Sequence, residues 1–292
     1  MWILLAAVSA LLLGFYDIFK KLSVRANNVP VVLWLNTLFG SLLLSPVILQ
    51  SLTGNQDVLP VVGHAHIMLK ALIVLGSWIL GYFAIKHLPL TIQGPVNATR
   101  PVLVLIGALL IFGERLNLWQ WAGVLLGILS LYMISRIGAN EGFSLRHSRW
   151  LWMSIGATVL GAISALYDKY LIHLYQPLQV QAWYSLYQCV IMGGVTIVLL
   201  RTSALRAKAG KFTWRWSIPC IALFLTAADM AYFYALSLPD AMIAIVSMMR
   251  RGSVLVSFAY GVLALHERGI RTKLVDLGIL LLGLACLTIG SL

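Results

Sequence analysis

Ten long apolar runs limit how this chain can fold more than any other feature of its sequence. A helix needs about 20 mostly apolar residues to cross a bilayer. Lipid offers no partner to backbone groups, so such runs must be helices that satisfy their own amides and carbonyls. They do not show the alternating apolarity of membrane β-strands. The ten predicted helices are residues 2–22, 30–50, 67–86, 91–113, 117–135, 150–172, 178–200, 217–237, 241–265 and 273–291.

The composition excludes a soluble protein of this length. Of 292 residues, 61% are hydrophobic and only 10% are charged, against about 45–50% and about 25% in soluble domains. In a soluble protein the net charge of +12 would suggest nucleic acid. Here the basic residues lie mainly in short loops, where they set topology and contact lipid headgroups. We therefore expect a multi-pass protein of the cell (inner or plasma) membrane, with membrane lipids as partners and no nucleic acid.

Short motifs from the first half recur about 150 residues later, in the same order. A tyrosine-aspartate pair, a tyrosine-phenylalanine pair and a glutamate-arginine pair each occur twice. The equivalent residues are Asp17 and Asp168, Tyr82 and Tyr232, and Glu114 and Glu267. Ordered matches at one spacing predict a duplication, with copies at residues 1–137 and 150–292.

Each copy contains five predicted helices. Because five is odd, the second copy enters the membrane from the opposite side and is inverted relative to the first. Inverted repeats build many secondary transporters, whose substrate sites lie near the midplane between the repeats. The sequence therefore predicts an all-α membrane protein of ten transmembrane helices, arranged as two inverted five-helix repeats.

The doubled motifs resemble those of the EamA family in the drug/metabolite transporter superfamily. In the first copy the resemblance rests on Pro101 followed by Gly113-Glu114-Arg115. In the second copy it rests on Arg250-Arg251-Gly252-Ser253 followed by His266-Glu267-Arg268. The resemblance covers the whole chain as two tandem units. It implies a ten-helix basket that moves small metabolites by alternating access, and it leaves the substrate open.

Three arginines lie about halfway along the fourth and ninth predicted helices: Arg100, Arg250 and Arg251. A charge at bilayer depth costs at least about 2.5–3.5 kcal/mol and marks a functional candidate. We hypothesise that Arg100 and Arg250 line a central cavity and bind a carboxylate or phosphate, because a guanidinium can hold two oxygens at once. Arg251 points about 100° away from Arg250 on a helix, so at most one of them faces the cavity squarely.

Asp17, Asp168 and Asp229 are candidates for gating or proton coupling. Asp17 and Asp168 lie near the far ends of helices that enter from opposite sides, so we expect them at opposite membrane faces. The alternative for Asp17 is a helix-end salt bridge with Lys20 or Lys21. Asp229 and Asp17 also offer the arginines a purely structural pairing.

The fourth predicted helix contains Pro95 and Pro101, which free backbone carbonyls and bend a helix. Such interruptions expose polar backbone to a cavity or serve helix packing. The remaining candidates for substrate contact are Asn36, Asn97, Trp34, Trp78, Tyr82, Tyr184 and Tyr232. Aromatic residues of these kinds also mark the membrane interface.

We expect a secondary active transporter, an exporter or exchanger, of small polar or anionic metabolites such as amino acids. The alternatives are a lipid flippase or a passive pore. An intramembrane enzyme is disfavoured because H-E-x-x-H and G-x-S-x-G do not occur, and no cofactor is expected. His64 and His66 are expected in a loop with no third ligand nearby, so no metal is predicted. Gly123-x-x-x-Gly127 fits close helix packing, either within the chain or in a homodimer.

The distribution of lysine and arginine also bears on orientation. Most of them lie in the loops that follow odd-numbered predicted helices. The positive-inside rule then places both termini outside the cytoplasm, whereas the family resemblance implies both termini inside.

Overall fold

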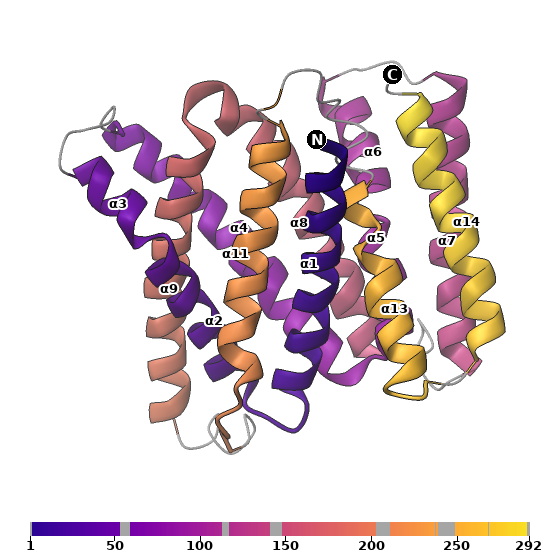
Figure 1. Cartoon of the computed structure of the whole chain (residues 1–292), viewed down its shortest axis with the longest axis horizontal. Coiled ribbons are helices and arrows are strands. Elements are labelled where there is room, and N and C mark those ends of the chain that lie inside the picture. Colours follow the sequence, from indigo (N-terminus) through magenta and orange to yellow (C-terminus); the bar gives the residue numbers. More distant parts are fainter. Residues whose placement is uncertain are drawn as a thin grey trace.

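The computed structural model is all-helical in the residues it describes, which are 2–52, 59–112, 117–140, 148–202, 211–236, 238, 249–267 and 269–290. The helices of the first half are α1 (Trp2–Val24), α2 (Val29–Leu43), α3 (Ser45–Leu52), α4 (Val61–His87), α5 (Leu90–Ala98), α6 (Arg100–Phe112) and α7 (Leu118–Asn140). Those of the second half are α8 (Arg149–Leu174), α9 (Pro177–Arg201), α11 (Ser217–Leu236), α13 (Ser253–Leu263) and α14 (Ile270–Ile289). Most of them stand side by side, and α1 begins at the same end of the bundle at which α14 finishes (Figure 1).

Each of the ten predicted ranges contains helix, although residues 241–248 of the ninth lie outside the described part. Among the described residues, five helices are long and apolar enough to cross a membrane, or six if α2 and α3 form one broken span. The chain is therefore a multi-pass membrane protein.

Three predicted helices are interrupted. The second bends by 53° between α2 and α3. The fourth breaks at Thr99, just before Pro101, which cannot donate an amide hydrogen to the preceding turn. In the ninth, residues 249–251 are helical, Gly252 forms a turn, and α13 follows. The breaks at Thr99 and Gly252 therefore lie in the two predicted helices that carry Arg100 and Arg250.

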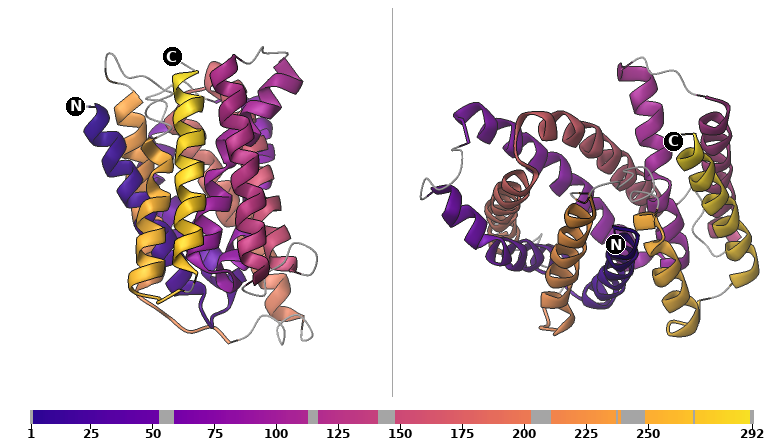
Figure 2. Two further views of the ribbon diagram at one scale, coloured as in Figure 1. Left: turned by 90° about the vertical axis from the view of Figure 1, so that its right-hand side faces the viewer. Right: turned by 45° about the horizontal axis from the view of Figure 1, so that its top comes forward.

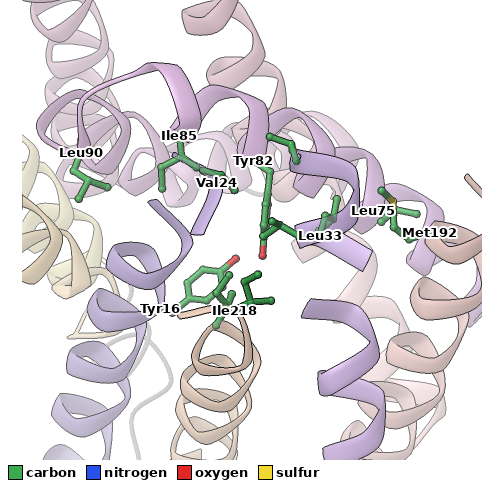
Figure 3. Packing of buried hydrophobic residues seen from close by; sticks show 12 residues of the cluster. Tyr16, Val24, Leu33, Leu75, Tyr82, Ile85, Leu90, Met192 and Ile218 are labelled. Atoms are coloured by element: carbon green, nitrogen blue, oxygen red, sulfur yellow. The ribbon is translucent and has the colours of Figure 1, made fainter. Parts of the chain in front are cut away.

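The helices pack in a definite order. α1 lies against α11 and α13, and α4 lies against α8 and α9. α7 and α14 pack on each other at one edge of the molecule (Figure 2). A buried cluster that includes Tyr16, Leu33 and Tyr82 joins α1, α2 and α4 (Figure 3). The hydroxyls of Tyr16 and Tyr82 point toward the same space between these helices.

The glycine motif of α7 is used inside the chain. A Cβ added at Gly123 would lie 2.5 Å from Cδ2 of Leu287 and 2.8 Å from the carbonyl oxygen of Gly283, both on α14. A Cβ at Gly127 would collide with Val102 of α6. These glycines therefore let α7 approach α6 and α14 closely, which is the internal alternative of the two predicted uses.

The expectation that His64 and His66 lie in a loop is wrong. Helix α4 begins at Val61, six residues before its predicted start, and contains both. The ring nitrogen Nδ1 of His64 is 2.7 Å from the Tyr187 hydroxyl, and the ring meets Trp183 edge-on. Aromatic partners on α9 thus satisfy a polar residue that interrupts the apolar pattern.

Candidate functional site

A small cavity lies between α2, α4, α9 and α11. Its volume of about 20 Å³ gives room for about one water molecule. Four of the predicted site residues line it: Asn36, Trp78, Tyr184 and Asp229. Gln181 and Gln188, which sequence reasoning missed, also line it, together with the hydroxyls of Thr37, Ser185 and Thr226.

Arg250 is held by a network of side chains at this cavity. Its Nη2 donates to Oδ1 of Asp229 in an ion pair, and the other carboxylate oxygen accepts from Nε2 of Gln181 at 2.9 Å. The guanidinium carbon lies 4.4 Å from the ring centre of Tyr232, a cation–π distance. Arg250 therefore forms the ion pair with Asp229 that the sequence offers as a structural alternative, and this pair lies beside the cavity.

Arg100 has a different environment. Its Nη2 donates to Oδ1 of Asn97 at 2.9 Å. Its Nε is buried and has no hydrogen-bond partner among the described residues. The guanidinium presses on Gly161 of α8, where an added Cβ would lie 2.5 Å from the Arg100 Cζ. Gly161 therefore makes room for Arg100, a role that sequence alone did not indicate.

The three arginines belong to one electrostatic cluster. Arg251 interacts with both Arg100 and Arg250, and its buried Nε has no partner within the described ranges. Asp17 interacts with Arg100 and with Lys20. The described charges of the cluster are Arg100, Arg250, Arg251, Lys20, Asp17 and Asp229. With all six groups in their usual ionised forms, this part of the cluster carries four positive and two negative charges.

Asp17 lies within electrostatic range of Lys20 and of Arg100, so the pairing with Lys20 that the sequence offers as an alternative stays a prediction. Lys21 does not pair with it, because the Lys21 Nζ donates to the carbonyl oxygens of Ile85 and Leu88 at 2.7 and 2.6 Å. The side chain of Asp168 lies outside the described residues.

The aromatic candidates serve separate purposes. Trp34 packs against Gly193 of α9, where an added Cβ would lie 2.9 Å from its Nε1. Tyr82 is buried, and Lys20 Nζ lies 4.5 Å from its ring centre. Its hydroxyl lies close to the side chains of Tyr16 and Asn36. The structure therefore brings Trp78 and Tyr184 to the cavity, Tyr232 to Arg250 and Tyr82 to Lys20.

One end of the bundle is tied together by contacts between distant segments. The Glu267 carboxylate accepts from the backbone amides of Leu90 and Thr91 at 2.8 and 2.9 Å, and from the Thr91 hydroxyl. Lys86 Nζ donates to the carbonyl oxygen of Asn27 at 2.8 Å. Arg215 donates to the carbonyl of Leu22. The second half of the chain thereby caps α5 in the first half.

The described residues contain no group of three or more histidine, cysteine, aspartate or glutamate side chains placed to hold a metal ion. What the site offers is a set of buried charges and amides around a small space.

Comparisons with known proteins agree with this picture. Residues 1–136 match the model of the EamA-like transporter family. One solved crystal structure is similar over 98% of this chain and 96% of its own, with a TM-score of 0.64 and 18% sequence identity, which shows a shared fold. No curated protein sequence matches the chain significantly.

Proposed function

We propose that this chain is a secondary active transporter. Through residues 1–136 it belongs to the EamA-like transporter family of the drug/metabolite transporter superfamily. It is therefore a membrane transporter and not an enzyme. It moves a small polar or anionic metabolite, such as an amino acid, by alternating access, as an exporter or exchanger. The proposed architecture is ten transmembrane helices in two inverted repeats.

The order of helix packing supports the inverted repeat. In the proposed equivalence, α1 corresponds to α8 and α4 to α11, so the packing of α1 on α11 has its counterpart in α8 on α4. The packing of α1 on α13 likewise has its counterpart in α8 on α6. The pairs α2–α9 and α7–α14 are each formed by equivalent helices. Such a pattern is expected when a twofold axis relates the halves.

The broken helices support a site near the midplane. Arg100 is the first residue of α6, and Arg250 and Arg251 stand just before α13. Each arginine therefore lies beside the start of a half-helix, the end that carries a partial positive charge. Transporters place such discontinuous helices around anionic groups of their substrates.

The excess of positive charge carries the proposal. Charges within a bilayer are costly unless another charge offsets them. Asp17 and Asp229 offset two of the four cations in the described cluster, and an anionic group on the substrate offsets more. Asp229 adds an acceptor for an ammonium group beside Arg250, which suits a zwitterion such as an amino acid.

The test is transport by the purified protein in liposomes. Amino acids, organic acids and phosphates are first screened for thermal stabilisation, because a ligand stabilises the state that it binds. The best ligand is then followed in counterflow. A carrier shows trans-stimulation, whereas a passive pore does not and a lipid flippase moves labelled lipid instead. Arg100→Gln and Arg250→Gln should both abolish counterflow, and full activity in both variants contradicts the proposal.

A further inference from the structure

Two amide side chains at the cavity carry polar atoms that nothing in the described structure satisfies. Asn36 lies on α2 and Gln188 on α9, and they are 2% and 1% exposed. Both line the cavity described above. Oδ1 of Asn36 and Nε2 of Gln188 have no hydrogen-bond partner in the described residues. One is an acceptor and the other is a donor.

These two residues hold equivalent positions in the proposed repeats. Gln188 follows Asn36 by the spacing that relates the other repeated motifs. α2 and α9, which carry them, pack against each other. The axis of the inverted repeat, which is part of the proposed function, therefore passes between the two amides. Substrate sites of inverted-repeat transporters lie at this interface.

Unsatisfied buried amides are unusual and costly. The large majority of buried polar groups in proteins have a partner, and leaving one without a partner is destabilising. Asn27 offers a comparison within the chain, because it is also 2% exposed. Its Nδ2 donates to the carbonyl of Thr213, and its Oδ1 accepts from the amides of Asn28 and Thr213. Asn27 is a fully satisfied structural amide, whereas the Asn36 side chain interacts with Tyr82 and its Oδ1 has no partner among the described residues.

We propose that Asn36 and Gln188 form a subsite for a neutral group of the transported molecule that both donates and accepts a hydrogen bond, namely a hydroxyl or a primary carboxamide. The group donates to Oδ1 of Asn36 and accepts from Nε2 of Gln188. The present cavity has room for about one water, which matches the size of a hydroxyl. Asp229 lines the same cavity and holds Arg250, so the anionic end of the molecule lies on the arginine side. The substrate class is therefore a small anion with a hydroxyl or carboxamide group.

The subsite is tested with pairs of probes that differ in one group. Propionate is compared with lactate, succinate with malate, and 4-methylpentanoate with succinamate, by calorimetric titration of the purified full-length protein in nanodiscs. We expect the hydroxyl or carboxamide member to bind about fivefold to tenfold tighter than its partner, the effect of about one hydrogen bond. Asn36→Leu and Gln188→Met should each remove this preference.

The outcomes separate this inference from the proposed function. If the wild type binds the anions with no preference within any pair, the subsite is refuted while the anion site stands. If the preference persists in both variants, the subsite is likewise refuted. If Arg100→Gln leaves succinate affinity unchanged, the anion site is refuted instead.

A second measurement needs no ligand. Because Asn36→Leu removes an unsatisfied polar group, it should leave the thermal midpoint of the free protein unchanged or raise it. Asn27→Leu, the matched control, should lower the midpoint by several degrees because it breaks bonds that are made. Equal loss of stability in the two variants would mean that Asn36 is a structural amide, and would overturn the inference.

Discussion

The fourth and ninth predicted helices, which are both broken, hold their arginines in opposite ways. Arg250, beside the break at Gly252, forms an ion pair with Asp229 and lies over Tyr232. Arg100, just after the break at Thr99, donates to the neutral amide of Asn97 and has an unpartnered Nε as far as the structure is described. At this point the second half pairs its arginine directly with a carboxylate, whereas the first half hydrogen-bonds its arginine to a neutral amide and places the Asp17 carboxylate within electrostatic range.

This difference separates two tasks that the sequence pattern makes look alike. A paired arginine stabilises the bundle, and its replacement leaves a buried carboxylate without a partner. An arginine whose hydrogen-bond partner is neutral keeps most of its positive charge available to attract a ligand. We therefore expect Arg250 to affect folding and transport together, and Arg100 to affect binding with little effect on folding.

The largest effect is expected from breaking the ion pair. Arg250→Gln leaves the Asp229 carboxylate facing Gln181 alone; because the pair is partly exposed, the cost lies below the about 3–5 kcal/mol of a fully buried pair that loses one partner. The thermal midpoint of the purified protein should fall by many degrees, and transport should be lost.

The double variant Arg250→Gln with Asp229→Asn is the control for that prediction. It replaces both charges by amides, so most of the lost stability should return while transport stays absent. An unchanged midpoint in Arg250→Gln alone would show that the pair does not stabilise the bundle, and the comparison would fail.

The next effect is expected at Arg100. Arg100→Gln removes the cation whose nearest acceptor is the neutral Asn97, so the midpoint should change by no more than a few degrees. Affinity for the best-stabilising anion should fall about 10-fold to 100-fold, the loss of a charged hydrogen bond of about 1.5–3 kcal/mol. Titration calorimetry measures it, with Arg149→Gln on a helix end as the control. A large loss of stability with unchanged affinity would reverse the assignment of the two arginines.

A smaller effect is expected at Glu267, which joins the second half of the chain to the start of α5 in the first half. Glu267→Gln weakens the cap on the amides of Leu90 and Thr91 by about 1 kcal/mol. Hydrogen exchange of the peptide that covers these residues should accelerate several-fold. The peptide around Gly123 serves as an internal reference, and equal exchange in both proteins would contradict the cap.

The smallest effect is expected at the break itself. Pro101→Ala restores an amide hydrogen near Thr99 and should raise stability by less than about 1 kcal/mol, because the residue is already in the first turn of α6. A straighter helix should slow transport turnover without changing affinity. Pro95→Ala, within α5, is the matched control. An equal change in transport turnover for the two variants would show that the break at Thr99 has no special role in transport.

Much of the fold could be predicted from the sequence. The length of the apolar runs and the lack of backbone partners in lipid place a helix in every predicted range, and Pro101 indicates the break that occurs at Thr99. The family could be identified from the doubled glutamate-arginine motifs. The ion pair of Arg250 with Asp229 was foreseen as one of two alternatives, since both residues lie within apolar runs.

The site was harder to predict because it depends on which helices face each other. Gln181 and Gln188 carry no charge, so nothing in an apolar run draws attention to them. The space that Gly161 gives to Arg100 exists only once α8 lies against α6. Glu267 lies just after the ninth predicted helix, yet the helix that it caps begins 177 residues earlier, at Leu90. Contacts of this kind follow from packing and leave no local pattern.

The cap at Glu267 has a consequence for chains of half this length. Residues 1–137 expressed alone would expose the amides at the start of α5 to the edge of the membrane, with no carboxylate to accept from them. A single-repeat chain of this type would close that end only by associating with a second copy that supplies the glutamate. Co-expression of residues 1–137 and 150–292 as separate chains should therefore rebuild the transporter. Neither fragment alone should form a transporter that is closed at this end.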